Sequence, residues 1–83
     1  MGFKYAQVYA GTISDTTGSI PDGVVTFFIV NSGSADVTLT FTNSSTFILE
    51  PGESFEATFI NQPYASIAID ATGSSVKYAY TTQ

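Results

Sequence analysis

The sequence predicts an all-β protein, a small β-sandwich of about seven short and mainly antiparallel strands. Short runs rich in β-branched and aromatic residues recur along the chain, and clusters of Gly, Pro, Asn, Asp and Ser separate them. These turn signals come about every 8 to 12 residues, a spacing typical of sandwiches and small barrels. No segment has a helical period, and residues 1–83 are expected to form one domain. An Ig-like order, a jelly-roll-like order and a small closed barrel all fit these signals.

The first third of the chain is expected to hold two strands and a loop. Residues 3–10 are rich in β-forming side chains, with Val8 facing away from the neighbouring aromatic residues. Residues 11–23 contain two groups of turn-forming residues, so we expect a loop there. Residues 24–30 (VVTFFIV) are apolar on both alternating sets of positions. This pattern favours a strand that is covered on both faces at the centre of a sheet.

Three later segments alternate between apolar and polar residues, as strands with one buried face do. Turn residues lie between them. The sets expected to point inward are Val37, Leu39 and Phe41; Ile67 and Ile69; and Val76, Tyr78 and Tyr80.

The densest local signals lie in residues 46–59, where two alternating runs meet at Pro51-Gly52. Pro followed by Gly suits the centre of a type II turn, because Pro presets φ and Gly accepts the positive φ that follows. A two-residue hairpin at this turn would set Phe47 opposite Glu56 and bury a carboxylate. We therefore expect either a bulged loop or an arch between two sheets.

The composition excludes several classes of function. The chain has no Cys and no His, so disulfides and the usual zinc ligands are excluded, and we expect no cofactor. Seven acidic residues against two lysines give a net charge of −5, which argues against a nucleic-acid partner. No apolar run forms a signal-peptide core or is long enough for membrane insertion. A chain this small buries only about 60 to 65% of its unfolded surface, so we expect support from other subunits.

The residues that could carry catalysis are few, because the chain lacks His, Cys and Arg. Glu50, Glu53 and Glu56 are close in sequence and are the one set that could work as a glycosidase pair. Turn and strand positions are expected to point them to solvent, so we predict no enzyme. Asp15 and Asp22 are oxygen ligands of the kind calcium accepts, but Asp favours turns by itself, so we predict no metal site.

Two isoleucines and three tyrosines are candidates for an interface. The isoleucines alternate away from the expected core, and a tyrosine ring combines an apolar body with a polar tip, as interface residues often do. The tyrosines of the last strand could instead close the core with their hydroxyls at its rim, and the three together could form a platform for sugars. The candidate interface residues are Ile48, Ile60, Tyr64, Tyr78 and Tyr80.

The passages FIVNSGSADVTLTF and FILEPGESFEATF resemble a pattern of small β-sandwich modules in bacterial surface proteins and phage virions. The pattern is a strand ending in Asn (Val30-Asn31), an alternating strand (residues 37–41), and an apolar strand (residues 47–49) followed by Pro-Gly-Glu-Ser. A surface module normally carries a signal peptide or sits in a longer chain, whereas a virion protein is made without one. The resemblance implies a capsid decoration, cement or tail-associated protein, and it concerns fold more than role.

We therefore expect a non-enzymatic structural or assembly protein of a phage virion, made in the host cytoplasm. It would pack against capsid or tail subunits, against copies of itself, or against both. A carbohydrate- or surface-binding β-sandwich module with a glycan ligand is the alternative, and an acid-based hydrolase is the third hypothesis.

Overall fold

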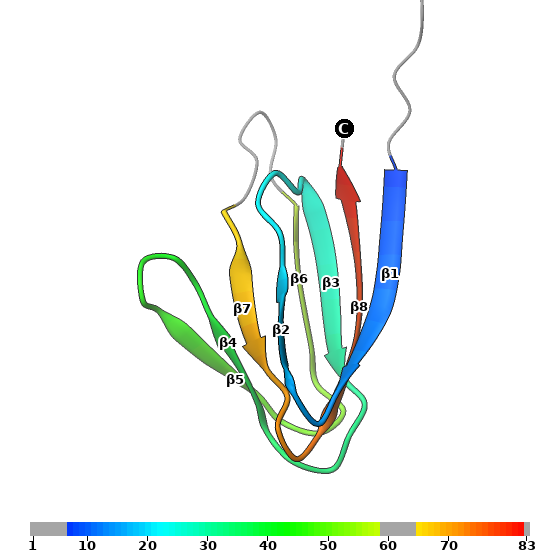
Figure 1. The fold of residues 1–83 in the computed structure, drawn as a ribbon, viewed down its shortest axis with the longest axis vertical. Coiled ribbons are helices and arrows are strands. Elements are labelled where there is room, and N and C mark those ends of the chain that lie inside the picture. Colours follow the sequence, from blue (N-terminus) through cyan, green and yellow to red (C-terminus); the bar gives the residue numbers. More distant parts are fainter. Residues whose placement is uncertain (1–6, 59–64, 83) are drawn as a thin grey trace, which may run out of the picture.

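The computed structural model describes residues 7–58 and 65–82, and these residues form eight strands in two antiparallel sheets. One sheet has the order β1-β8-β3-β6 and the other the order β2-β7-β4-β5 (Figure 1). The strands are β1 (Gln7–Ser14), β2 (Thr17–Ile20), β3 (Thr26–Asn31), β4 (Val37–Thr40), β5 (Thr46–Leu49), β6 (Ser54–Thr58), β7 (Ile67–Asp70) and β8 (Ser75–Thr82).

The pairing of the strands identifies the arrangement as a jelly roll. β1 pairs with β8, β2 with β7, β3 with β6 and β4 with β5. Consecutive strands lie in different sheets except β4 and β5, so the chain behaves as one long antiparallel ribbon wound into two layers. The sandwich prediction is therefore confirmed with the jelly-roll-like order. The described strands form two separate sheets rather than a closed barrel or an Ig-like order.

The prediction of a loop over residues 11–23 is wrong. β1 continues to Ser14, and β2 is a further short strand within this range. The described residues therefore form one strand more than the predicted seven. β2 lacks an alternating pattern because Gly18 occupies one of its inward positions. A Cβ atom at Gly18 would lie 2.5 Å from the Ile13 side chain, so the neighbouring strand fills the space that a larger residue would take.

The strand expected to be covered on both faces is buried on one face only. β3 does lie inside its sheet, between β8 and β6, as predicted. Phe27 and Ile29 are fully buried, whereas Phe28 is 40% exposed on the opposite face. The apolar run thus supplies one side to the core and leaves the other side facing solvent.

The core lies between the sheets and is made of aliphatic residues and one phenylalanine. The inward sets predicted for β4, β7 and the start of β8 are buried, and Phe41, Tyr78 and Tyr80 pack partly buried against them. The buried core residues are Ile13, Ile20, Val24, Phe27, Ile29, Val37, Leu39, Leu49, Ile67, Ile69, Ala71 and Val76.

The connection at Pro51-Gly52 is an arch between the sheets, which confirms one of the two expected alternatives. β5 belongs to the second sheet and β6 to the first. Gly52 has a φ of 85° and the Glu53 N–H donates to the Glu50 carbonyl at 2.9 Å, as in a β-turn. Because the two strands do not pair, Glu56 lies opposite Phe28 instead of Phe47.

A buried asparagine joins the loops at one end of the sandwich, which we call the closed end. The Asn31 amide nitrogen donates to the carbonyls of Ala35 and Leu49, both at 2.8 Å. Its oxygen accepts from the Gly33 N–H at 3.0 Å and from the Ser74 hydroxyl at 2.9 Å. One side chain therefore ties β3 to the loop after it, to the end of β5 and to the β7–β8 turn. Asn31 is 1% exposed, so these four bonds replace its contacts with water.

Candidate functional site

The most unusual surface of the molecule lies between β5 and β6, the outer strands of the two sheets, which do not pair but meet through the rings of Phe47 and Phe55. We call it the open edge and define it as Phe41, Phe47, Ile48 and Phe55. The sequence places these residues on both sides of the inter-sheet arch, because β5 ends one sheet and β6 ends the other. In Figure 1 the β4–β5 hairpin leans away from β3 and β6. Phe47 on this hairpin is 43% exposed, so the two sheets leave this ring partly uncovered.

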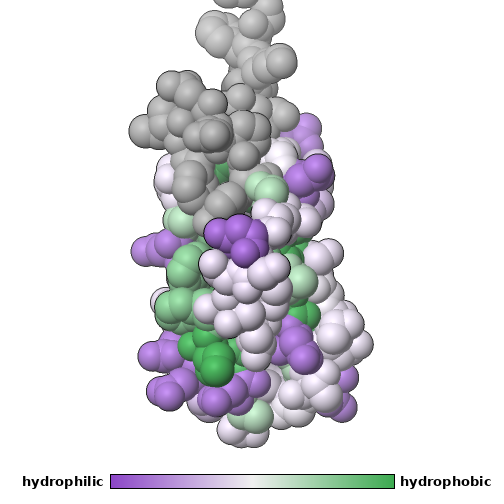
Figure 2. All heavy atoms as spheres, turned by 90° about the vertical axis from the view of Figure 1, so that its left-hand side faces the viewer, coloured by the Kyte–Doolittle hydropathy of each residue, from purple (hydrophilic) through white to green (hydrophobic). Residues whose placement is uncertain are grey.

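The phenylalanines of the open edge form one cluster that runs from the core to the surface. The ring of Phe55 lies 5.6 Å from Phe27, 5.9 Å from Phe41 and 5.2 Å from Phe47, measured between centroids. These separations are typical of favourable aromatic pairs. Phe27 is fully buried, whereas Phe47 is 43% exposed. Figure 2, which faces the side of the β4–β5 hairpin, shows apolar surface gathered between polar residues.

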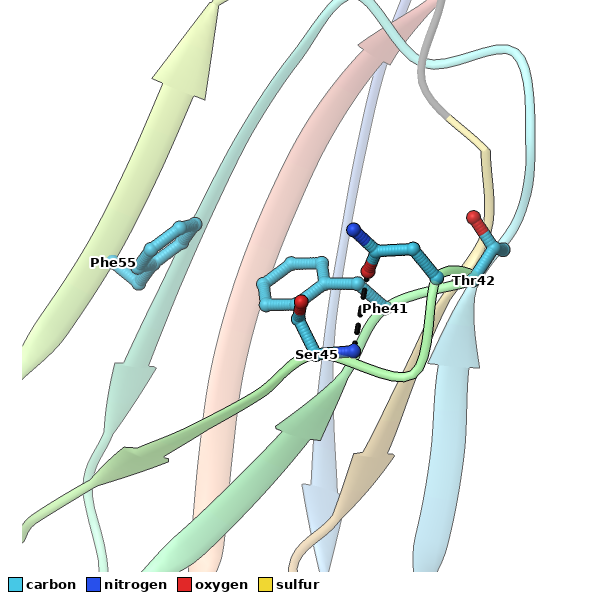
Figure 3. A pocket seen from close by; sticks show the side chains of 5 residues that line it. Phe41, Thr42, Ser45 and Phe55 are labelled. Carbon is cyan, nitrogen blue, oxygen red and sulfur yellow. Dashed lines mark hydrogen bonds between the residues drawn. The ribbon is translucent and has the colours of Figure 1, made fainter.

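A pocket of about 380 Å³ opens beside this cluster, lined by Phe41, Thr42, Asn43, Ser45 and Phe55. The Phe41 ring points toward Phe55 across the pocket (Figure 3). The turn after β4 holds the polar wall in place, since the Ser45 N–H donates to the Asn43 side-chain oxygen at 3.1 Å and the Phe41 N–H donates to the Ser45 carbonyl at 2.8 Å. The pocket thus combines two aromatic rings with an amide and two hydroxyl groups.

The structure separates the predicted interface residues. Ile48 is 57% exposed on β5 and belongs to the open edge. Tyr78 and Tyr80 point inward from β8, on the same face as Val76, and pack against the core. Ile60 and Tyr64 lie outside the described residues. Their joint role as an interface stays a prediction.

Tyr78 and Tyr80 belong to a row of stacked rings. Tyr80 lies 5.4 Å from Tyr9 and 6.1 Å from Tyr78 between ring centroids. Opposite Tyr78, β1 carries Gly11, and a Cβ atom there would lie 2.6 Å from the tyrosine oxygen. The glycine makes room for the ring. This half-buried stack fits tyrosines that close the core better than an outward platform.

The carboxylates that were considered for catalysis serve as turn and surface residues. The Glu53 side chain accepts a hydrogen bond from the Glu50 N–H at 2.8 Å and so caps the arch. Glu56 is exposed on β6. Within the described residues no group of three or more His, Cys, Asp or Glu side chains lies close enough to hold a metal ion.

The two aspartates considered for calcium lie at opposite ends of β2 and do not share a site. Asp15, which has a φ of 54°, accepts a hydrogen bond from the Gly73 N–H at 2.8 Å. Asp70 accepts from Thr72 in a similar way at 3.1 Å. Hydrogen bonds from the Thr72 side chain and backbone hold the pKa of Asp70 below its ordinary value of 3.8. These acidic side chains therefore stabilise turns.

The pocket residues were not singled out from the sequence. Alternation predicts Phe41 on an inward face, and the structure packs Phe41 and Phe55 partly buried against the core. Their exposure depends on how far the sheets are covered at the β5–β6 side, which local pattern does not encode. The available signal was the inter-sheet arch, because an arch puts the edges of two sheets next to each other.

Comparisons with models of protein families, with curated proteins and with solved structures found no match. In the part of the chain that the structure describes, no helix has the length and apolar character needed to cross a membrane.

Proposed function

We propose that the protein is a non-enzymatic structural subunit that packs its open edge against a neighbouring protein, as a decoration, cement or tail-associated component of a phage virion. The observation that carries the proposal is the exposed apolar edge. Phe47 and Ile48 are 43% and 57% exposed on opposite faces of one short edge strand, and exposed apolar side chains gathered at one sheet edge favour an interaction site. A partner that clasps β5 would cover both side chains.

Two further observations support this proposal. The phenylalanine cluster anchors Phe47 through Phe55 to the buried Phe27, so the exposed ring is held in place before a partner arrives. Preorganised aromatic anchors lose little entropy on binding and often dominate interface energy. The jelly roll is also an architecture of viral capsid domains, although this is an analogy of fold and not of site.

Co-sedimentation with purified capsid shells and tails tests the proposal. We expect the chain to pellet with one of these particles, and we expect Phe47→Ser and Ile48→Ser each to weaken binding about tenfold or more, as truncation of an interface anchor does. The matched control is Tyr9→Ser, which removes an aromatic ring of similar exposure, 45%, from β1. Failure of the folded chain to bind any particle would contradict the proposal.

The pocket favours a second candidate, a carbohydrate- or surface-binding module. Its aromatic rings could pack against the apolar face of a sugar while Asn43, Thr42 and Ser45 bond to hydroxyl groups. A glycan array with the native chain and Asn43→Ala tests it. Glycan binding that Asn43→Ala abolishes would favour this module, and an array without a hit would reject it.

A further inference from the structure

The first sheet has an outer face that no described strand covers. Alternation directs Phe27, Ile29 and Val76 into the core, so their neighbours in sequence point away from the second sheet. Val8, Ala10, Phe28, Val30 and Ala79 lie on this outer side, which we call outer face A. Val8 is 69% exposed and Phe28 is 40% exposed. The rest of the face is mostly Thr and Ser.

The charges on outer face A are few and opposite. The four strands β1, β8, β3 and β6 contain two charged residues, Lys77 and Glu56. Lys77 pairs with Val30 on one side of β3, and Glu56 pairs with Phe28 on the other side. On a chain of net charge −5, this face is electrically neutral. Two copies that meet on this face therefore bring no excess of like charge together.

We infer that a second copy of this chain packs on outer face A, related by a two-fold axis that runs along β3. The inference rests on the proposed assembly function and names one partner and one surface for it. The positions of Lys77 and Glu56 select this axis, because a two-fold interface brings the same surface patch together from both copies.

Two alignments of facing sheets are compatible with two-fold symmetry and with the near-parallel strands of packed sheets. An axis across the strands would place β8 over β8 and β6 over β6, so that like charges would meet. An axis along β3 places β8 over β6 of the partner. Lys77 of each copy then lies across from the partner's Glu56, displaced by the two residues that separate Val30 from Phe28 along β3. This pairing occurs twice in the dimer, and the Phe28 side chains of the two copies face each other. Only the second alignment pairs opposite charges.

The size of the face sets the expected strength. With the axis along β3, the strands β8, β3 and β6 overlap with the partner. At about 4.8 Å between strands and about 3.3 Å per residue, the contact area is on the order of 300 to 400 Å² per copy. The total falls below the standard interface of about 1,200 to 2,000 Å². Free copies should therefore associate weakly, and neighbours held by a common particle should associate far more strongly because their effective concentration is high.

Sedimentation equilibrium and NMR dilution of the purified chain, from about 10 µM to about 1 mM, measure this association. We expect a monomer–dimer equilibrium and concentration-dependent shifts at residues of outer face A. Glu56→Lys and Lys77→Glu should each weaken the dimer about tenfold, because each sets like charges against each other. The double variant E56K/K77E should restore it, since the opposite charges then face each other again.

Glu56→Lys separates this pairing from simple repulsion. It lowers the net negative charge of −5 by two, so general repulsion between copies predicts tighter association, whereas the proposed pairing predicts weaker association. Both charged side chains are exposed, so all variants should fold. A chain that stays monomeric near 1 mM, or a double variant that stays as weak as the single ones, would overturn the inference.

A pair of phenylalanine variants distinguishes this inference from the proposed function. Phe28→Ser should abolish the dimer and leave binding of a single chain to a particle unchanged. Phe47→Ser should do the opposite. If Phe28→Ser leaves the dimer intact, the inference fails while the open edge can still bind a particle, and if no particle binds, the dimer measurement still stands.

Discussion

The closed end and the open edge differ in which kind of side chain they bury. At the closed end Asn31 is 1% exposed and makes four hydrogen bonds. At the open edge Phe47 and Ile48 leave about half of their surface in solvent. The polar Asn31 is thus buried, whereas the apolar Phe47 and Ile48 are partly exposed. The difference indicates that the closed end stabilises the fold, and that the open edge leaves apolar surface available for a partner.

The largest effect should come from Asn31→Ala. The substitution removes four hydrogen bonds and leaves buried groups of Leu49, Ser74 and the loop after β3 without their partner, so we expect a loss of about 3 to 4 kcal/mol in the free energy of unfolding. Urea unfolding measures it. Ser74→Ala, which removes one of these bonds, should cost about 1 kcal/mol. Equal costs for the two variants would contradict the central role of Asn31.

Phe47→Ala tests the open edge and should cost less. Complete burial of a phenylalanine is worth about 3 kcal/mol at most in transfer free energy, and Phe47 is 43% exposed, so we expect about 1 to 1.5 kcal/mol. The matched variant is Phe27→Ala in the same aromatic cluster, which is fully buried and should cost about 3 to 5 kcal/mol. Thermal unfolding of both variants compares them. Similar losses would mean that Phe47 is a core residue and the open edge is not available.

Gly52→Ala tests the backbone of the arch that joins the two regions. Gly52 has a φ of 85° and no atom within 4 Å of where a Cβ would stand, so the cost should be that of the left-handed conformation alone, about 1 kcal/mol. For a domain of this size that corresponds to a fall of about 4 to 8 °C in Tm. Gly52→Asn should lose less, because Asn tolerates this conformation better.

The smallest effect concerns Asp70, an exposed polar residue beside the closed end. Its folded-state pKa lies below 3.8 because the Thr72 hydrogen bonds favour the ionised form. The ionised carboxylate therefore contributes stability above the unfolded-state pKa, and this contribution is lost as the pH falls through the lower folded-state pKa. Urea midpoints between about pH 6 and pH 3 should fall less for Asp70→Asn than for the native chain. If the urea midpoints of Asp70→Asn and of the native chain fall equally with pH, Asp70 does not contribute to the acid dependence of stability.

Local pattern was sufficient for much of the fold. The alternation of Val37 with Leu39 and of Ile67 with Ile69 identifies strands with one buried face, and the structure buries all four side chains. The register around Pro51-Gly52 excluded a plain hairpin, which would bury Glu56, and left a bulged loop or an arch; the structure has the arch. Each of these inferences uses residues that are near one another in sequence, where the strand period applies directly.

The errors come from contacts between distant residues. β2 was missed because Gly18 is small to fit Ile13 of another strand. Asn31 was seen as the end of a strand, but its role depends on Ser74, which is 43 positions away. The exposure of Phe28 and Phe47 depends on how far the two sheets cover each other. These contacts join residues that are far apart in sequence, so the pattern within a single turn or strand does not predict them.

The winding of the strands also determines when the protein can fold. β8 is the last of the eight strands to be synthesised, yet it lies inside its sheet, between β1 and β3, and Gln7 pairs with Thr82. The first sheet cannot assemble until the ribosome has released this segment. Pairings over such sequence separations are slow to form. β3 can pair with β6 before β8 is made, whereas β1 has no partner strand in its sheet until β8 is available. The complete first sheet is therefore the last part of the fold to form.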